Sequence, residues 1–99
     1  MSVDNKYPTR QILENAAECL RVLGHPARLH MLHLLREKNR TVGQLADLAG
    51  IKNNVASEHL RLMQRCGFLS SKKDGTQVHY SISETHIFDI LDCIRKRFS

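Results

Sequence analysis

Five polar side chains between residues 54 and 65 recur at the spacing of one helix face. They stand at i, i+3, i+4, i+7 and i+11 and are Asn54, Ser57, Glu58, Arg61 and Arg65. The first three positions carry side chains that form hydrogen bonds, as base edges in a DNA major groove require. The last two carry guanidinium groups, which suit the flanking phosphates. The stripe therefore predicts a surface that contacts double-stranded DNA.

A solvated amphipathic helix without a partner would show the same stripe, so the neighbouring residues decide between these interpretations. From Lys52 to Asp74 there are five basic and two acidic residues, which is +3 of the +5 of the whole chain. Lys72 and Lys73 follow the helix closely. This positive excess favours an anionic partner.

The other face of this helix is apolar, with Ala56, Leu60 and Met63 pointing inward. His59 lies nearer that face and is interpreted as structural. Asn53 or Asn54 is expected to cap the helix, which ends near Cys66. A shorter helix before it begins at the capping box Thr41–Gln44 and ends at Gly50. Its expected inward residues are Val42, Leu45, Leu48 and Ala49.

The rest of the chain predicts three more helices and one hairpin. A first helix runs from Thr9 to Gly24, a second opens at His25-Pro26, and Ser83 caps a last helix with Glu84 in its first turn. The strands 68–73 and 76–82 flank Asp74-Gly75, where both turn positions are expected to take positive φ. The fold class is thus mostly α with a small β-hairpin (α+β), in the order ααααββα.

Length and composition limit the function classes. A chain of 99 residues, 41% hydrophobic and 25% charged, suits one folded domain, with a mobile N-terminal arm over residues 1–9 and the domain over 10–99. Apolar residues never run more than two together, so we expect no membrane partner, no secretory signal and a cytoplasmic location. No nucleophile-plus-base pair, glycine-rich phosphate loop or complete metal triad supports an enzyme.

Three stretches resemble the ArsR/SmtB family of winged helix-turn-helix repressors: LGHPARLHMLHLL (23–35), TVGQLADLAGIKNNVASEHLRLMQRCGFL (41–69) and KKDGTQVHYSI (72–82). The resemblance implies a homodimer through the first and last helices, bound to an inverted-repeat operator until an effector is sensed. It also implies that Asn53, Asn54, Ser57 and Glu58 face bases. By the same resemblance, phosphates would meet Lys52, Arg61, Lys72 and Lys73, with help from Gln77 and His79 of the wing.

The sequence departs from both familiar metal patterns of that family. Thr41-Val42-Gly43 stands where the family's Cys-x-Cys ligands would lie. Glu84 and His86 match the first half of the other pattern, but its second half falls near Arg97, a cation. Two ligands do not make the four-ligand set that zinc prefers, so a divalent metal ion at Glu84 and His86 competes with a plain helix-start carboxylate and an exposed histidine.

The cysteines offer a rival sensor. Cys19 lies on the apolar face of the first helix and Cys93 beside that of the last, and the resembled fold packs these helices together within or across subunits. Arg97, four residues after Cys93, favours its thiolate. Cys66 at the end of the 54–65 helix could couple oxidation, or a thiophilic ion such as arsenite, to DNA binding. The plainer interpretation is that each cysteine is a small buried hydrophobic residue.

Two function classes follow. The first is a transcriptional repressor that binds operator DNA as a homodimer and responds to thiol oxidation or a metal ion. The second is a small dimeric metal- or thiol-handling protein with no role in gene regulation. The polar stripe beside a basic hairpin distinguishes them, because the second class has no use for it.

Overall fold

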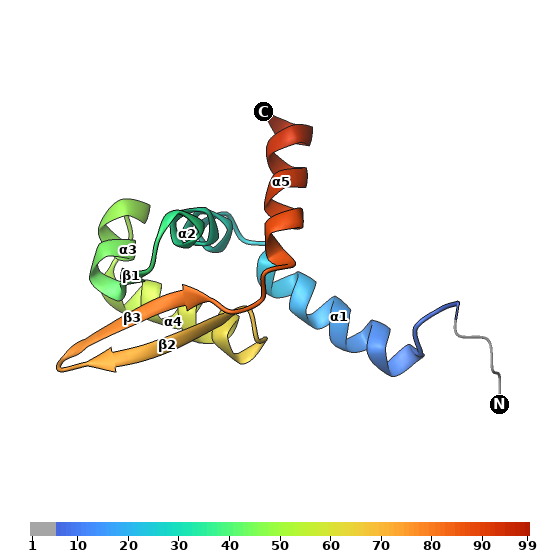
Figure 1. The fold of residues 1–99 in the computed structure, drawn as a ribbon, viewed down its shortest axis with the longest axis horizontal. Coiled ribbons are helices and arrows are strands. Elements are labelled where there is room, and N and C mark those ends of the chain that lie inside the picture. Colours follow the sequence, from blue (N-terminus) through green and yellow to red (C-terminus); the bar gives the residue numbers. More distant parts are fainter. Residues whose placement is uncertain (1–5) are drawn as a thin grey trace.

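Within residues 6–99, which the computed structural model describes, the chain forms five helices and a three-stranded antiparallel sheet (Figure 1). In chain order the elements are α1 (Arg10–Leu23), α2 (Pro26–Glu37), β1 (Arg40–Thr41), α3 (Val42–Ala49), α4 (Asn53–Arg65), β2 (Leu69–Asp74), β3 (Gln77–Ile82) and α5 (Ile87–Phe98). This confirms the predicted fold class and helix order. The predicted N-terminal arm includes residues 1–5, which lie outside the described residues, so that boundary stays a prediction.

The helix ends follow local sequence signals. Thr9 caps α1 by accepting a hydrogen bond from the Ile12 amide, and His25 caps α2 with Pro26 at the first helical position. The predicted capping box at α3 is present: the Thr41 hydroxyl accepts from the Gln44 amide at 3.1 Å, and the Gln44 side chain accepts from the Thr41 amide at 3.0 Å. Gly50 then turns with φ 71°, which leads the chain into α4.

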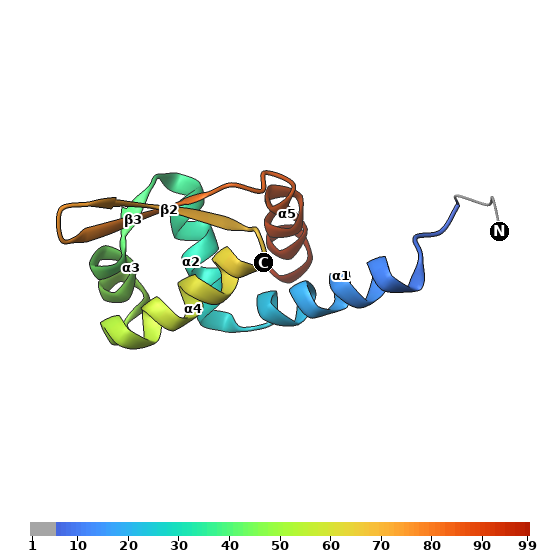
Figure 2. The ribbon, with the colours of Figure 1, turned by 90° about the horizontal axis from the view of Figure 1, so that it is seen from below.

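The sheet has the strand order β1-β3-β2, with the hairpin β2–β3 extending beyond the helices (Figures 1 and 2). The short strand β1 pairs with β3 and was not predicted, because two residues are too few to show a period. The predicted turn is wrong by one residue. Asp74 pairs with Gln77, so Gly75 and Thr76 form the turn, and among the described residues only glycines take positive φ. Gly75 takes the positive φ that the first position of a type II′ turn requires.

The core gathers around α2, whose Met31, Leu32 and Leu35 are buried. Helices α3, α4 and α5 and the base of the hairpin pack against it through Leu45, Ala46, Ala56, Leu60, Met63, Leu69, Tyr80, Ile87 and Leu91. The prediction that Leu48 points inward is wrong, since this side chain is 50% exposed. Ala46 is buried instead, since the side of α3 that faces the core carries positions 45 and 46.

Helix α5 begins later than predicted. The Ser83 hydroxyl donates to the Gly67 carbonyl at 3.0 Å, and the amides of Ser83 and Glu84 donate to the Phe68 carbonyl. These bonds hold residues 83 and 84 in the exit from β3, so Ser83 does not cap the helix and Glu84 lies before its first turn. The long-range partner at Phe68 overrides the local capping signal.

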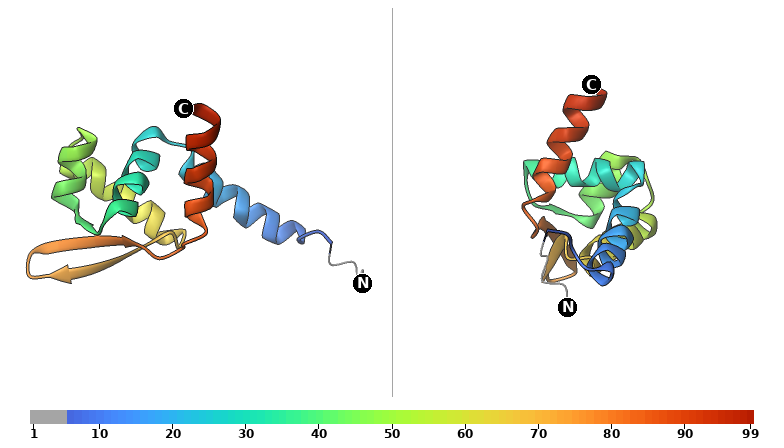
Figure 3. Two further views of the ribbon diagram at one scale, coloured as in Figure 1. Left: turned by 45° about the horizontal axis from the view of Figure 1, so that its top comes forward. Right: turned by 90° about the vertical axis from the view of Figure 1, so that its right-hand side faces the viewer.

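Helices α1 and α5 lie at the end of the molecule opposite the hairpin tip, and each extends away from the body (Figures 1 to 3). Of the predicted apolar face of α1, only Leu23 is buried. Large apolar side chains remain in water on both helices: Ile12 54%, Leu13 53%, Leu20 58% and Phe98 77% exposed. Packing within one chain therefore leaves these two helices incompletely covered.

Candidate nucleic-acid interface

Helix α4 separates its two faces as its period predicts. Ala56, Leu60 and Met63 are each 0% exposed and form the inward face. On the opposite face Asn54, Glu58, Arg61 and Arg65 are exposed and Ser57 is half-buried. At 1.5 Å per residue the stripe from Asn54 to Arg65 extends over about 16 Å. The hydrogen-bonding groups stand at its start, and the guanidinium groups follow.

The start of α4 differs from the prediction, because neither asparagine side chain is used as a helix cap. Neither Asn53 nor Asn54 is the cap: Lys52 occupies that position, and no side chain makes a cap hydrogen bond there. Asn53 and Asn54 thus lie inside the first turn with exposed side chains. Exposed asparagine amides can donate and accept at the same time, which is what an adenine edge requires.

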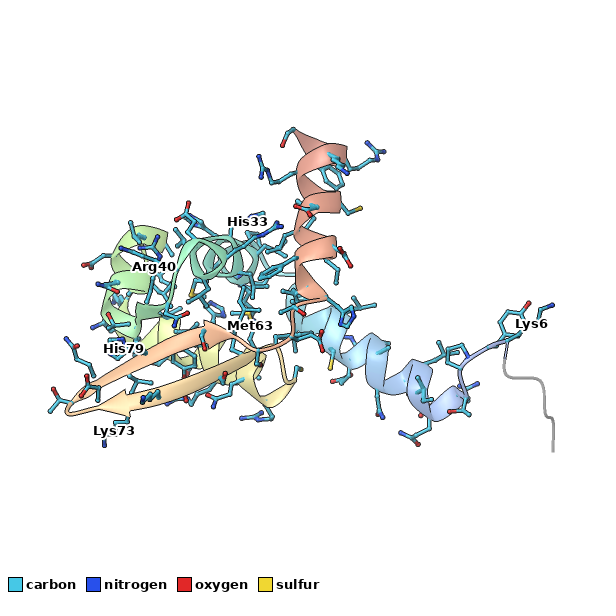
Figure 4. All side chains as sticks on the ribbon, in the orientation of Figure 1. Lys6, His33, Arg40, Met63, Lys73 and His79 are labelled. Carbon is cyan, nitrogen blue, oxygen red and sulfur yellow. The ribbon has the colours of Figure 1, made fainter. Side chains whose placement is uncertain are left out.

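The hairpin carries its lysines on both faces. Lys72 pairs with His79 and Lys73 with Val78, and paired residues share a face in an antiparallel ribbon. Val78 packs against the core while Lys72 and Lys73 are exposed, so the two lysines point to opposite sides of the ribbon. Figure 4 shows Lys73 and His79 on the two strands, near the end of the hairpin that lies away from α1.

Two grooves connect these residues. One of about 370 Å³ lies between the starts of α3 and α4 and the hairpin turn, and brings Asn53 and Ser57 together with Gln77. The other, about 470 Å³, lies along the hairpin and joins Lys72, Lys73 and His79. The sequence missed further lining residues: Thr41, Gly43 and Thr76 in the first groove, and Asn39 in the second. Their segments are short loops and helix starts that carry no periodic signal.

Arg61 and Arg65 take different places along α4. Arg61 lies close enough to the Tyr80 hydroxyl to act on its ionisation, although burial dominates and raises the pKa of Tyr80. It thereby reaches the base of the hairpin. Arg65 lies one turn later, beside Cys66 at the helix end. The positive charge thus continues from the hairpin along the exposed side of α4.

Comparison with known proteins agrees with this arrangement. The model described as bacterial regulatory protein, arsR family, matches residues 25–71. The HTH-type transcriptional regulator Rv0081 of Mycobacterium tuberculosis is 36% identical over 81 residues, covering 81% of this chain and 71% of its own. The chain belongs to the ArsR family.

A further relative and two solved structures are also similar to this chain. The transcriptional repressor SmtB of M. tuberculosis is 32% identical over 84 residues, 85% of this chain, which spans only 62% of SmtB. The crystal structure of Rv0081 superposes with a TM-score of 0.78 at 32% identity, covering 89% of each chain. That of NolR from Sinorhizobium fredii gives 0.83 at 26% identity, covering 93% of this chain and 96% of NolR. The relatives SmtB and Rv0081 are transcriptional regulators, not enzymes.

The cysteines of this ArsR-family chain are grouped differently from the expected Cys19–Cys93 pair. Within one chain Cys19 lies close enough to Cys66 to act on the ionisation of its thiol, across the contact between α1 and the end of α4. Burial, with Cys19 and Glu18 close by, raises the pKa of the Cys66 thiol to about 11. Cys93 is exposed on α5, in a groove of about 490 Å³ with Asp89, Asp92, Lys96 and Arg97. An approach of Cys93 to Cys19 across subunits stays a prediction.

Glu84 and His86 do lie close together, but they hydrogen bond to each other. The Glu84 carboxylate accepts from the His86 amide at 3.0 Å and contacts His86 Nδ1 at 2.6 Å. These bonds, the backbone one first, lower the pKa of Glu84. Among residues 6–99 no three His, Cys, Asp or Glu side chains gather as a metal-binding group. Two donors from one chain do not fit the four-ligand zinc set.

His59 packs against α2, as its interpretation as a structural residue predicts. Its Nδ1 accepts a hydrogen bond from Arg28 Nε at 2.9 Å, and its ring lies 4.5 Å from that of His25. No local pattern predicts the role of Arg28, because this contact joins residues 31 positions apart. Separately, no helix in the described part of the chain is long and apolar enough to cross a membrane.

Proposed function

We propose that this chain binds double-stranded operator DNA as a homodimer and represses transcription. The observation that carries the proposal is the exposed row on α4, formed by Asn54, the half-buried Ser57 and Glu58, opposite the buried face of the helix. Of this row, Ser57 lines a groove together with Gln77 beside the hairpin turn. A helix with that surface fits the major groove, and the hairpin lysines reach flanking phosphates. As a DNA-binding protein whose family model describes bacterial regulatory proteins, it would work in the cytoplasm.

The uncovered apolar side chains support the homodimer. Ile12, Leu13 and Leu20 on α1 and Phe98 on α5 are each more than half exposed, at the end of the molecule away from the hairpin. A second copy placed there would cover them and leave both α4 helices free. Two-fold symmetry then predicts a pseudo-palindromic site with half-sites about one helical turn apart.

The repressor function rests on the relatives as well as on the site. SmtB carries the name of a transcriptional repressor, and Rv0081 that of a transcriptional regulator. A metal- or thiol-handling protein without a regulatory role would need neither the exposed row on α4 nor the hairpin lysines, so we favour the repressor.

The effector, in this proposal, acts on thiols. Oxidation of Cys19 and Cys66 by a peroxide would form one disulfide between α1 and α4, with one oxygen of the peroxide leaving as water and the other as an alcohol or water. The two thiol protons end in those products. Such a bond would restrain α4 against α1, while the alternative at Cys93 would act on α5. A metal ion at Glu84 and His86 would need ligands from a second copy.

The test begins with a duplex selected by the reduced, chelator-treated protein from a random-sequence library. Its affinity is compared with that of a scrambled duplex by fluorescence anisotropy. We expect a specificity ratio well above one, and Asn54→Ala to lower that ratio at one base pair by about tenfold. Asn15→Ala, on α1, serves as the matched control. An unchanged ratio for Asn54→Ala would show that the assigned face does not contact bases.

The effector is tested on the same duplex with mild peroxide treatment, followed by a reductant. If oxidation weakens binding, Cys66→Ser and Cys93→Ser identify the thiol: the effect disappears in the variant that lacks the reacting residue. Full retention of binding after complete oxidation of all three cysteines would exclude a thiol effector. The metal alternative is tested on the same duplex: after removal of the chelator, zinc is titrated into the wild type and into Glu84→Gln, and their DNA binding is compared.

A further inference from the structure

Arg28 on α2 connects three helices through its side chain. Its Nε donates to Nδ1 of His59 on α4 at 2.9 Å, and its Nη1 donates to the Val22 carbonyl, near the end of α1, at 2.9 Å. Both bonds are partly buried. Because the guanidinium is planar, the two donors hold fixed directions. Arg28 therefore fixes α4 relative to α1 from one point on α2.

The His59 ring must be neutral to take part. An imidazole nitrogen that accepts a hydrogen bond carries no proton, so the proton of His59 lies on Nε2. The neighbouring His25 is also hydrogen bonded, since its Nδ1 accepts from the Ala27 amide at 3.1 Å. The two rings lie 4.5 Å apart at an angle of 52°. The Arg28 guanidinium thus bonds to the neutral His59 ring, with the His25 ring packed beside it.

The Arg28–His59 contact lies directly beside the proposed DNA-binding surface of α4. His59 follows directly after Glu58, a member of the exposed row on α4, and precedes the buried Leu60. Val22 lies at the end of α1, the helix whose apolar side chains are uncovered. Arg28 thereby bridges the helix that we assign to the dimer and the helix that we assign to DNA.

We propose that Arg28 and His59 are positioning residues that hold α4 in its DNA-binding orientation, and that protonation of His59 opens this contact in acid. The proposal rests on the proposed DNA-binding function and extends it to regulation by pH. Neither residue needs to touch DNA. When the contact opens, α4 samples other orientations, and the apparent affinity falls in proportion to the fraction of molecules that keep the binding-competent orientation.

The direction of the pH effect follows from the groups that face His59. These are Arg28 and His25 from the α2 side and Glu58 from α4. Burial first, then Arg28 and His25, lower the pKa of His59, and Glu58 opposes them only in part. A histidine with a lowered pKa stabilises the folded state fully above its unfolded value of about 6.5. That contribution is lost as the pH falls below this value.

The test uses the duplex selected at neutral pH and four variants. Arg28→Lys keeps the charge, but one ammonium group cannot reach both His59 and the Val22 carbonyl, so we expect about tenfold weaker binding at pH 7.5. His59→Gln keeps an acceptor and cannot be protonated. We expect it to bind like the wild type at pH 7.5. At about pH 5.5 the wild type should lose about tenfold more affinity than His59→Gln.

Two histidine controls separate this contact from other titrating groups. His30→Gln removes an exposed histidine of α2 and should leave the acid loss unchanged. His79→Gln removes the hairpin histidine, whose protonation would strengthen phosphate contacts, so this variant should show a larger acid loss. If His59→Gln loses affinity in acid as steeply as the wild type, or if Arg28→Lys binds as tightly, the proposal is wrong.

A measurement without DNA keeps the proposal separate from the function on which it rests. Hydrogen exchange of the α4 amides should speed up between neutral pH and about pH 5.5 in the wild type, after correction for the intrinsic rate, and not in His59→Gln. The α3 amides serve as the internal reference. Protein that binds no duplex but shows this difference would overturn the DNA-binding function alone. Equal exchange in both proteins would overturn the positioning role.

Discussion

The two ends of this molecule differ in how completely one chain builds them. At the hairpin end, α4 buries Ala56, Leu60 and Met63 and exposes its polar row. One chain therefore completes this surface, and we call it the finished end. At the other end, which we call the unfinished end, α1 and α5 leave Leu20 58% and Phe98 77% exposed. The exposed polar row is therefore free to contact a ligand, whereas the exposed apolar faces call for a second copy.

The largest expected effect comes from a substitution in the exposed apolar face of α1, at the unfinished end. Leu20→Asp places a charge on the exposed apolar face of α1, so we expect a monomer in sedimentation equilibrium. Binding to the selected duplex should fall by about a hundredfold or more, because the two half-sites are no longer bound by one linked species. The winged part should still melt cooperatively, since Leu20 contributes little to the core.

Leu48→Asp is the matched control for this experiment. Leu48 is 50% exposed, much like Leu20, but it lies on α3 at the hairpin end. This variant should sediment like the wild type. A Leu20→Asp variant that stays dimeric at the same concentration would remove α1 from the interface and with it the contrast between the two ends.

The cysteines offer a second contrast between a closed and an open site. Burial raises the pKa of Cys66 from 9.0 to about 11, whereas Cys93 is exposed on α5. At pH 7.5 the thiolate of Cys66 is then about a hundredfold scarcer than that of a free model thiol, so we expect iodoacetamide to alkylate Cys66 more slowly than this thiol by about that factor. Alkylation of Cys66 should also be slower than that of the exposed Cys93. Timed peptide mass spectrometry measures both rates.

Unfolded protein provides the reference for this labelling. In urea the three cysteines should react at similar rates, because the burial that protects Cys66 is gone. Equal rates for Cys66 and Cys93 in the native protein would mean that the contact between the end of α4 and α1 opens readily, and that burial does not protect Cys66.

Within the finished end, Arg61 tests whether the charge on α4 meets phosphates. Arg61→Ala should weaken binding to the selected and the scrambled duplex alike, by about tenfold, and lower the slope of log affinity against log salt by about one. Arg10→Ala on α1 removes the same charge at the opposite end and should change neither. Weakening of the selected duplex alone would give Arg61 a role in reading bases.

Local signals made the hairpin end largely predictable from the sequence. The capping box at Thr41, the glycine turn at Gly50 and the two faces of α4 depend on residues within four positions of one another. Such signals also predicted both strands of the hairpin. They failed at Asp74, where strand pairing extended one residue further than the turn motif indicated.

Contacts between distant residues could not be predicted. Ser83 carries a capping signal, but Gly67 and Phe68 hold it in an extended exit from β3. The Arg28–His59 bond and the Cys19–Cys66 contact each join separate helices, and nothing local marks the partners. The unfinished end was predicted only through the family resemblance, because an apolar helix face looks the same whether its own chain or a second copy covers it.

The smallest expected effect concerns the bond that attaches the unfinished end to the core. Arg36 on α2 donates to both carboxylate oxygens of Asp92 on α5, at 2.7 and 3.3 Å, and lies over the Phe88 ring at 4.7 Å. The hydrogen bond from Arg36 lowers the pKa of Asp92 below 3.8. A carboxylate with a lowered pKa stabilises the fold fully above its unfolded value, and this contribution is lost as the pH falls through the folded one. Asp92→Asn should therefore lower the melting temperature by about 2 °C at pH 7, and the difference should vanish in strong acid.

Glu14→Gln provides the control, since it breaks an ion pair with Arg10 that lies within α1 and joins no two elements. Its melting temperature should match that of the wild type, because exposed pairs within one helix contribute little. If Asp92→Asn instead lowers the melting temperature equally at every pH, the charge of Asp92 is not what holds α5. The buried Ile87 and Leu91 would then attach the helix by packing alone, and the two ends of the molecule would be joined only through the core around α2.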